Sequence, residues 1–153
     1  MTYDVDALMG VALDEADAAL AHDDVPIGAV VARIDTGEVI ARRHNERELT
    51  GDPTAHAEVL ALRDAAAVMG GWRLDGCVMV VTLEPCAMCA GALVNARVAE
   101  LAYGATDPKA GAVTSLYELT TDARLNHRVE VRGGVGAAAS SSRLKAFFAS
   151  RRG

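Results

Sequence analysis

The chain has 153 residues, of which 51% are hydrophobic and 24% charged, a composition that excludes disordered and collagen-like classes and fits one domain over residues 1–153. Three cysteines are too few, and too odd in number, for a disulfide framework, which leaves thiols held by a metal or used in redox chemistry. The formal net charge of −6 argues against nucleic-acid binding by the chain as a whole.

The first half of the chain predicts a helix, a hairpin and a second helix. Apolar residues recur at helical spacing over residues 5–20. Residues 27–34 and 39–42 have strand character and flank a turn at 35–38, which is typical of a β-hairpin. Asp52-Pro53 supplies a cap and a first-turn proline for a helix that runs to Gly70-Gly71.

The second half alternates strands with helices. Residues 78–83 are apolar on both faces, as in the middle of a sheet, and a helix is expected over 86–96. Short strands follow at 98–103 and 129–132, and the low-complexity segment 133–142 is interpreted as a flexible lead into a last helix over about 142–150, which carries a basic tail. The pattern predicts an α/β fold, a three-layer α/β/α sandwich with a mixed sheet of about five strands.

Charge is distributed unevenly along the chain. Residues 1–30 contain seven acidic residues and no Lys or Arg, whereas residues 124–153 contain seven basic residues and one Glu. Two interpretations remain open: two solvated helix faces, or a basic rim that binds a polyanion.

Nothing in the sequence predicts contact with a membrane. The longest apolar stretches, such as residues 77–81, are far shorter than the roughly 20 residues that span a bilayer. The first four residues contain one acidic residue, Asp4, and no basic residue, whereas a signal peptide begins with basic residues. We therefore expect a cytoplasmic protein.

Two short motifs carry ligand chemistry. His56-Ala57-Glu58 and Pro85-Cys86-Ala87-Met88-Cys89 each lie at an expected helix N-terminus. There the helix dipole favours the thiolate form, and cysteines three apart present their sulfurs on one side. Cys86 and Cys89 predict a zinc site, with His56 as a third ligand brought in by the fold.

The fourth ligand decides whether such a site is structural or catalytic. Cys77, the remaining cysteine, would lie roughly 20 Å of extended strand away from Cys86. An open position for water is therefore favoured, with Glu58 as the base. A redox Cys-x-x-Cys pair, and a binding module with a closed zinc site that includes Cys77, are the alternatives.

Taken together, the motifs resemble those of the zinc-dependent nucleobase deaminases. The sequence is similar to the bacterial tRNA-specific adenosine deaminases of the cytidine deaminase-like superfamily over residues 5–132 and 144–152. Asp107-Pro108-Lys109 and Asn126-His127-Arg128 favour this branch over enzymes that act on a free base. The matching segments are VPIGAV from Val25, HN at His44, DPTAHAE from Asp52, TLEPCAMCAGAL from Thr82, YGATDPKAGA from Tyr103 and RLNHRVEV from Arg124.

The resemblance implies a hydrolytic mechanism and a set of site residues. One Zn²⁺ per subunit is bound by His56, Cys86 and Cys89, and Glu58 shuttles protons while the adenosine at the wobble position of a tRNA anticodon loop becomes inosine. A zinc-dependent deaminase of free guanine, cytosine or adenosine is the alternative. The substrate-binding residues implied are Asn45, Val25, Pro26, Asp107, Lys109, Arg151 and Arg152.

The resemblance also implies partners, namely a tRNA anticodon stem-loop and a second copy of the chain in a homodimer. The small residues Ala90, Gly91 and Ala92 would permit close helix packing at such an interface. Phe147 and Phe148 are expected as core anchors of the last helix, and base stacking by one of them is the alternative. Gly136–Ser142 departs from the family pattern, which leaves the docking of that helix open; Ser140 to Ser142 are candidate caps.

Overall fold

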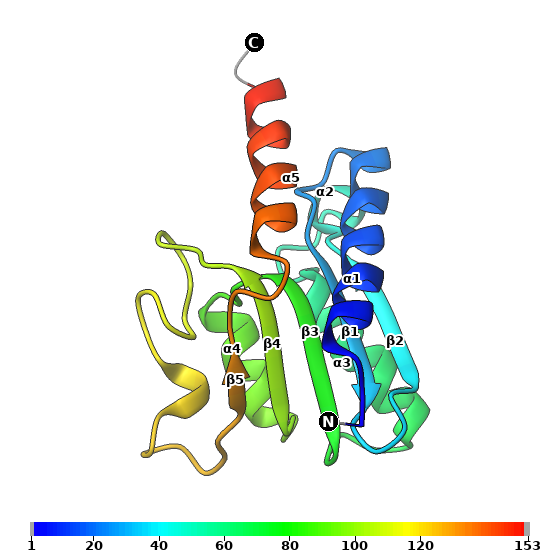
Figure 1. Ribbon diagram of the computed structural model, residues 1–153, viewed down its shortest axis with the longest axis vertical. Coiled ribbons are helices and arrows are strands. Elements are labelled where there is room, and N and C mark those ends of the chain that lie inside the picture. Colours follow the sequence, from blue (N-terminus) through cyan, green and yellow to red (C-terminus); the bar gives the residue numbers. More distant parts are fainter. Residues whose placement is uncertain (1, 152–153) are drawn as a thin grey trace.

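The computed structural model describes residues 2–151 and contains one mixed five-stranded sheet (Figure 1). Its strand order is β2-β1-β3-β4-β5. β1 pairs antiparallel with both β2 and β3, whereas β3, β4 and β5 run parallel. The predicted mixed sheet is confirmed. The strands are β1 (Gly28–Arg33), β2 (Val39–His44), β3 (Cys77–Leu83), β4 (Glu100–Ala105) and β5 (Glu130–Arg132).

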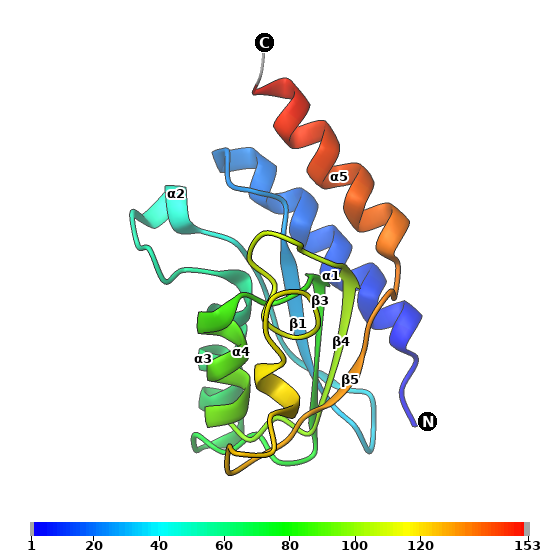
Figure 2. The same ribbon diagram turned by 90° about the vertical axis from the view of Figure 1, so that its left-hand side faces the viewer.

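Helices cover both faces of the sheet (Figure 2). α1 (Val5–Ala19) and α5 (Ala137–Ser150) lie on one face, and α3 (Ala57–Met69) and α4 (Ala87–Asn95) lie on the other. A short helix, α2 (Arg47–Thr50), joins β2 to α3, and 3₁₀ turns occupy Leu20–His22 and Leu119–Thr121. None of the helices in residues 2–151 has both the length and the apolar character needed to cross a bilayer.

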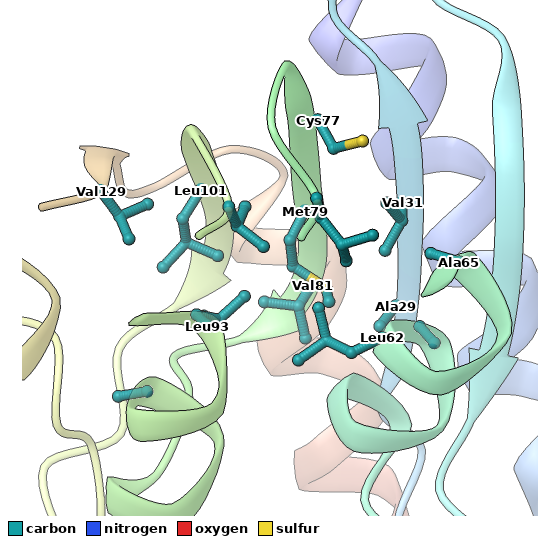
Figure 3. Close-up of a cluster of buried hydrophobic side chains, with 14 of the residues drawn as sticks. Ala29, Val31, Leu62, Ala65, Cys77, Met79, Val81, Leu93, Leu101 and Val129 are labelled. Atoms are coloured by element: carbon teal, nitrogen blue, oxygen red, sulfur yellow. The ribbon is translucent and has the colours of Figure 1, made fainter. Parts of the chain in front are cut away.

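β3 is the centre of the core because its side chains alternate between two buried clusters. Cys77, Met79 and Val81 point toward α3 and α4 and pack with Leu62 and Leu93 (Figure 3). The intervening Val78 and Val80 pack under α1 with Met9 and Ala12. The apolar run at 78–83 is thus explained by burial on both faces.

The strand directions bring four chain segments to one edge of the sheet. β2, β3 and β4 all run toward this edge, and β1 starts from it, since Gly28 pairs with His44 and Val81 pairs with both Ala29 and Tyr103. The residues that follow β2, β3 and β4, and those that precede β1, therefore meet there.

Two predicted helix boundaries are wrong. α3 begins at Ala57, with His56 at the N-cap position, rather than at Asp52-Pro53. The Asp52 carboxylate instead accepts hydrogen bonds from the backbone N–H and hydroxyl of Thr54, which makes a turn before the helix. His56 consequently lies at the pole of α3 itself.

α5 begins at Ala137, five residues earlier than predicted, so the low-complexity segment is not a flexible lead. Gly136 adopts a left-handed φ of 65° at the start of the helix, and three alanines, good helix formers, follow. Ser140 is not a cap: it is buried within α5, and its hydroxyl donates to the carbonyl of Thr82 at the end of β3. Tertiary contact therefore orders this segment.

The acidic and basic ends of the chain pair with one another. Arg143 of α5 contacts Asp17 of α1 at 2.8 Å, and Arg151 contacts the Asp23 carboxylate at 3.3 Å. Some of the acidic residues near the start of the chain and the basic residues near its end thus form ion pairs with each other. Neither solvated helix faces nor a basic rim, the two interpretations drawn from the sequence, included this arrangement.

Gly28 provides a test of the packing between α1 and β1. A Cβ at Gly28 would overlap the carbonyl oxygen of Ala12 and lie 2.7 Å from the nitrogen of Ala16. Gly28→Ala is expected to lower the free energy of unfolding in urea by about 1–3 kcal/mol, because α1 must move away from the sheet. Gly10→Ala is the control, because a Cβ there meets no heavy atom within 4 Å, and it should raise stability by roughly 0.5–1 kcal/mol. Equal effects of the two substitutions would contradict this packing.

Candidate metal centre and active site

His56, Cys86 and Cys89 come together at the edge of the sheet described above. His56 and Cys86 are the N-cap residues of α3 and α4, and Cys89 lies in the first turn of α4. The Nδ1 atom of His56 lies 3.6 Å from the Sγ of Cys86 and 3.5 Å from the Sγ of Cys89. The three ligand atoms all lie within 4.8 Å of one another.

These distances fit a tetrahedral zinc ion. Bonds of about 2.0–2.1 Å to nitrogen and about 2.3 Å to sulfur would separate the two kinds of ligand atom by about 3.6 Å. One imidazole and two thiolates are also ligands that zinc prefers. The donor set and its spacing therefore suit this metal.

The two thiols favour a cation for an electrostatic reason. Hydrogen bonds from Cys89 and His56 lower the pKa of Cys86 to about 4, against the opposing effect of burial. The pKa of Cys89 is raised, first by its interaction with Cys86 and then by burial. Both sulfurs can ionise together only if a positive charge lies between them.

Cys77 does not belong to this group. It lies at the start of β3, whereas Cys86 follows the end of that strand, and its side chain is buried among apolar residues (Figure 3). Within residues 2–151, the grouped metal-binding side chains number three. Three protein ligands would leave the fourth position of a zinc ion to a water molecule, as in catalytic zinc sites.

Glu58 lies in the first turn of α3, two residues after His56. Its side chain is 4% exposed, and burial raises its pKa to about 7. In the middle of a helix, two residues separated by one would diverge by roughly 200°. At the N-terminal pole of α3, His56 and Glu58 instead line one cavity.

That cavity has a volume of about 650 Å³, a size suited to a nucleobase and its sugar. Of the predicted substrate-binding residues, Val25, Asn45, Asp107, Lys109 and Arg151 all line it. Pro26 is buried and is not among the lining residues, so its expected place in the pocket wall is not observed. Arg152 lies outside the described residues.

Two lining residues were missed or only half predicted from the sequence. Arg47 of α2 lies at the cavity, although no motif marks it. Phe148 also lines the cavity and is 46% exposed, whereas its neighbour Phe147 is 7% exposed. The pair of phenylalanines thus divides into one core anchor and one residue whose ring is open to a ligand, which helical spacing alone does not reveal.

A buried carboxylate holds one wall of the cavity. Glu84, 2% exposed, accepts hydrogen bonds from the backbone N–H groups of Asp107, Val113, Thr114 and Ser115. The Ser115 hydroxyl donates to it as well. Through these contacts Glu84 orders the loop that carries Asp107 and Lys109.

Glu84→Gln is expected to destabilise the protein most near neutral pH. Burial opposes ionisation of Glu84, but the hydrogen bonds outweigh it and lower its pKa to about 2. A depressed carboxylate pKa contributes stability that is complete above the unfolded-state value and is lost as pH falls toward the folded-state value. Urea unfolding should show that Glu84→Gln lowers the free energy of unfolding by about 2–3 kcal/mol at pH 7. This difference from wild type should become smaller as pH falls from about 4.5 toward 2.

The control for this substitution is Glu118→Gln, which removes an exposed carboxylate from the same region. Glu118→Gln should change the free energy of unfolding by no more than about 0.5 kcal/mol, both near neutral pH and at acidic pH. A Glu84→Gln effect that stayed constant from pH 7 to pH 3 would mean that the ionised carboxylate does not hold the loop.

Comparison with known proteins identifies relatives of this chain. The profile of the MafB19-like deaminase family matches residues 3–152. A tRNA-specific adenosine deaminase of Bacillus subtilis is 45% identical over 148 residues, which cover 97% of this chain and 90% of that protein. One from Streptococcus pyogenes serotype M1 is 44% identical over 140 residues, 92% of this chain and 81% of that protein.

Solved structures give the same assignment of the fold. One, from a study of A-to-I editing by tRNA:A34 deaminases at the wobble position of transfer RNA, has a TM-score of 0.86 and 43% sequence identity, covering 90% of this chain and 99% of that one. The guanine deaminase from Nitrosomonas europaea has a TM-score of 0.83 and 27% identity, covering 96% and 86%.

Proposed function

Because this chain belongs to the family of tRNA-specific adenosine deaminases, we propose that it hydrolyses the wobble adenosine of a tRNA anticodon loop to inosine. One observation carries the proposal: a His-Cys-Cys triad and a buried glutamate share a nucleoside-sized cavity in a chain 44–45% identical to proteins named for this reaction. An anticodon loop suits such a cavity because its bases are single-stranded and can enter without disrupting a duplex.

His56, Cys86 and Cys89 would hold one zinc ion per subunit, and zinc bound in this way supplies a water of lowered pKa. Glu58 accepts a proton from the attacking water and delivers it to N1 of adenine as oxygen bonds to C6. Glu58 then moves a second proton to the amino group, which leaves as ammonia. The balance is adenosine plus water giving inosine plus ammonia.

The proton transfers suit the surroundings of Glu58. A carboxylate with a pKa raised to about 7 by burial can both accept and return a proton near neutral pH. The lining residues Asn45 and Val25 would contact the base, since an amide can both donate to and accept from a purine edge.

The rim of the cavity would follow the RNA backbone. Lys109, Arg47 and Arg151 supply positive charge there, and Asp107 would face a sugar hydroxyl. Phe148 offers an exposed ring on which a flanking base can stack. A formal charge of −6 does not by itself prevent RNA binding, because three cationic side chains line the cavity where the phosphates would lie.

Deamination of a free base is the alternative, and the similarity to guanine deaminase makes it worth testing. The identity of 27% to that enzyme, against 43–45% to the tRNA deaminases, favours the RNA substrate. So does the rim of charged and aromatic residues, which a free base would not reach.

The deciding experiment incubates the zinc-loaded protein with an anticodon stem-loop that contains a wobble adenosine. Mass analysis and nucleoside digestion should reveal inosine at that position, and a stem-loop with guanosine there serves as the control substrate. Release of ammonia from free guanine, cytosine or adenosine, with the stem-loop unchanged, would refute the proposed substrate.

We further propose that the protein works in the cytoplasm as a homodimer. A tRNA substrate supports the location, and an apolar groove between α3 and α4 supports the association, with Trp72 59% exposed at its side. Analytical ultracentrifugation should give a dimer that Trp72→Glu dissociates. The groove is lined by Val59, Leu62, Arg63, Ala66, Trp72, Ala92, Asn95 and Ala96.

A further inference from the structure

Two histidines that have no role in the proposed reaction steps meet beside the active-site cavity. His22 ends the 3₁₀ turn after α1, and His44 is the last residue of β2. Their Nε2 atoms lie 3.1 Å apart, while the ring centroids are 5.2 Å apart. The Nε2 edges of the two rings therefore face each other at hydrogen-bond distance.

Each imidazole is bound on its other nitrogen by a carboxylate. Nδ1 of His22 lies 2.6 Å from Asp24, and Nδ1 of His44 lies 2.9 Å from Glu15. Burial opposes the ionisation of both carboxyl groups, but the hydrogen bonds that they accept outweigh it and lower the pKa of each. Ionised carboxylates only accept hydrogen bonds, so both Nδ1 atoms carry a proton.

The remaining contact requires a third proton. If both Nδ1 atoms are protonated and both rings are neutral, two lone pairs would oppose each other at 3.1 Å. One proton between the Nε2 atoms removes this conflict and gives the pair a single positive charge. Together with Arg42, which donates to Glu15, that charge balances the two carboxylates.

Further hydrogen bonds connect this histidine pair to the wall of the cavity. Asp24 accepts hydrogen bonds from the backbone N–H groups of Glu48 and Leu49 in α2. Asn45 directly follows His44, and its side-chain oxygen accepts from the backbone N–H of Arg47. The short helix α2 is thus held between Asp24 and Asn45, and both Asn45 and Arg47 line the cavity.

We propose that His22 and His44 are positioning residues that share one proton and thereby hold Asn45 and α2, with Arg47, in place to bind the RNA substrate. The kinetic part of this inference rests on the proposed function; the proton sharing does not. The link matters because α2 has four residues, too few to keep its position through its own hydrogen bonds.

The proton can be observed without any activity measurement. In ¹⁵N-histidine-labelled, zinc-loaded protein near pH 7, NMR should show four histidines, two of which are protonated at Nδ1 and have Nε2 signals intermediate between the protonated and unprotonated values. Loss of these signals in His22→Asn and His44→Asn assigns them. Two neutral rings, or a ring unprotonated at Nδ1, would overturn the inference.

Asparagine is the informative replacement at both positions. Its amide can still donate to Asp24 or Glu15 in place of Nδ1, but it does not reach the partner ring, so each single variant breaks only the link between the two residues. KM for the anticodon stem-loop should rise about five- to tenfold in each, with kcat and zinc content within about twofold of wild type.

The double variant separates this link from independent structural effects. Since either substitution breaks the same link, His22→Asn/His44→Asn should raise KM no further than one of them does. Effects that multiply, or a fall in kcat with KM unchanged, would overturn the positioning role. Glu38→Gln, which breaks the exposed ion pair with Arg33 at the other end of the β1–β2 hairpin, should leave KM unchanged.

Failure of this inference can be told apart from failure of the proposed function. If wild-type protein does not deaminate the stem-loop, the proposed substrate is wrong, and the NMR result still decides whether the proton is shared. If wild-type protein deaminates the stem-loop and the asparagine variants bind the stem-loop as wild type does, only the positioning role is refuted.

Discussion

Replacing Glu58 by Gln is expected to lower kcat on the anticodon stem-loop by about 10²–10⁴-fold, the usual contribution of a positioned acid-base group. Gln has nearly the same volume, so the buried site at the pole of α3 should remain packed, but an amide cannot accept the proton from water or return it to the leaving amine. Single-turnover deamination, followed by inosine analysis, measures the effect.

Zinc content is the matched readout for this variant. Glu58 is not one of the three grouped ligands, so Glu58→Gln should keep one zinc per subunit, as should Glu130→Gln, which removes an exposed carboxylate from β5. Glu130→Gln should also keep full activity. If Glu58→Gln retained wild-type kcat, or if its loss of activity followed a loss of zinc, Glu58 would not be the proton shuttle.

Cys86→Ser is expected to remove the metal and reduce deamination to background. Serine keeps the shape of the side chain but does not provide a thiolate, and the loss of a direct ligand should exceed the roughly 10–100-fold loss of affinity caused by changing an outer partner. Dialysis against a weak chelator followed by metal analysis measures retention, and activity should not return when zinc is added at concentrations that restore chelated wild type.

Cys77→Ala is the matched control for this substitution. Cys77 is fully buried at the far end of β3, so the small cavity left behind should cost about 1 kcal/mol of unfolding free energy. Zinc content and kcat should stay as in wild type. Loss of zinc in Cys77→Ala would indicate a closed structural site, and a reversible disulfide between Cys86 and Cys89 without bound metal would indicate an oxidoreductase.

The architecture could be predicted because its signals are local. β3 shows burial on both faces in its apolar run, and Pro85 marks where α4 begins. The grouping of His56 with Cys86 and Cys89 was also predicted, from ligand types that suit zinc at two expected helix starts. The structure confirms the grouping, because both helices start at the same edge of the sheet.

The boundaries that were predicted wrongly depend on contacts between distant residues. Asp52 has the composition of a helix cap, yet its carboxylate stabilises a turn with Thr54, and α3 begins four residues later than the proline implies. Ser140 lies in a segment of low complexity, which is ordered because its hydroxyl bonds to the carbonyl of Thr82, 58 residues away.

The sequence by itself determined the ligand types, the glutamate and the alternation of strands and helices, since these are properties of residue chemistry and of spacing within a few turns. Only the tertiary structure decided which side chains complete the site. Arg47 and Phe148 line the cavity. Glu84 accepts hydrogen bonds from a loop more than 20 residues away along the chain, and His22 contacts His44. These contacts join segments whose separation along the chain carries no periodic signal, and they exist only because strand order and direction bring the segments to one edge of the sheet.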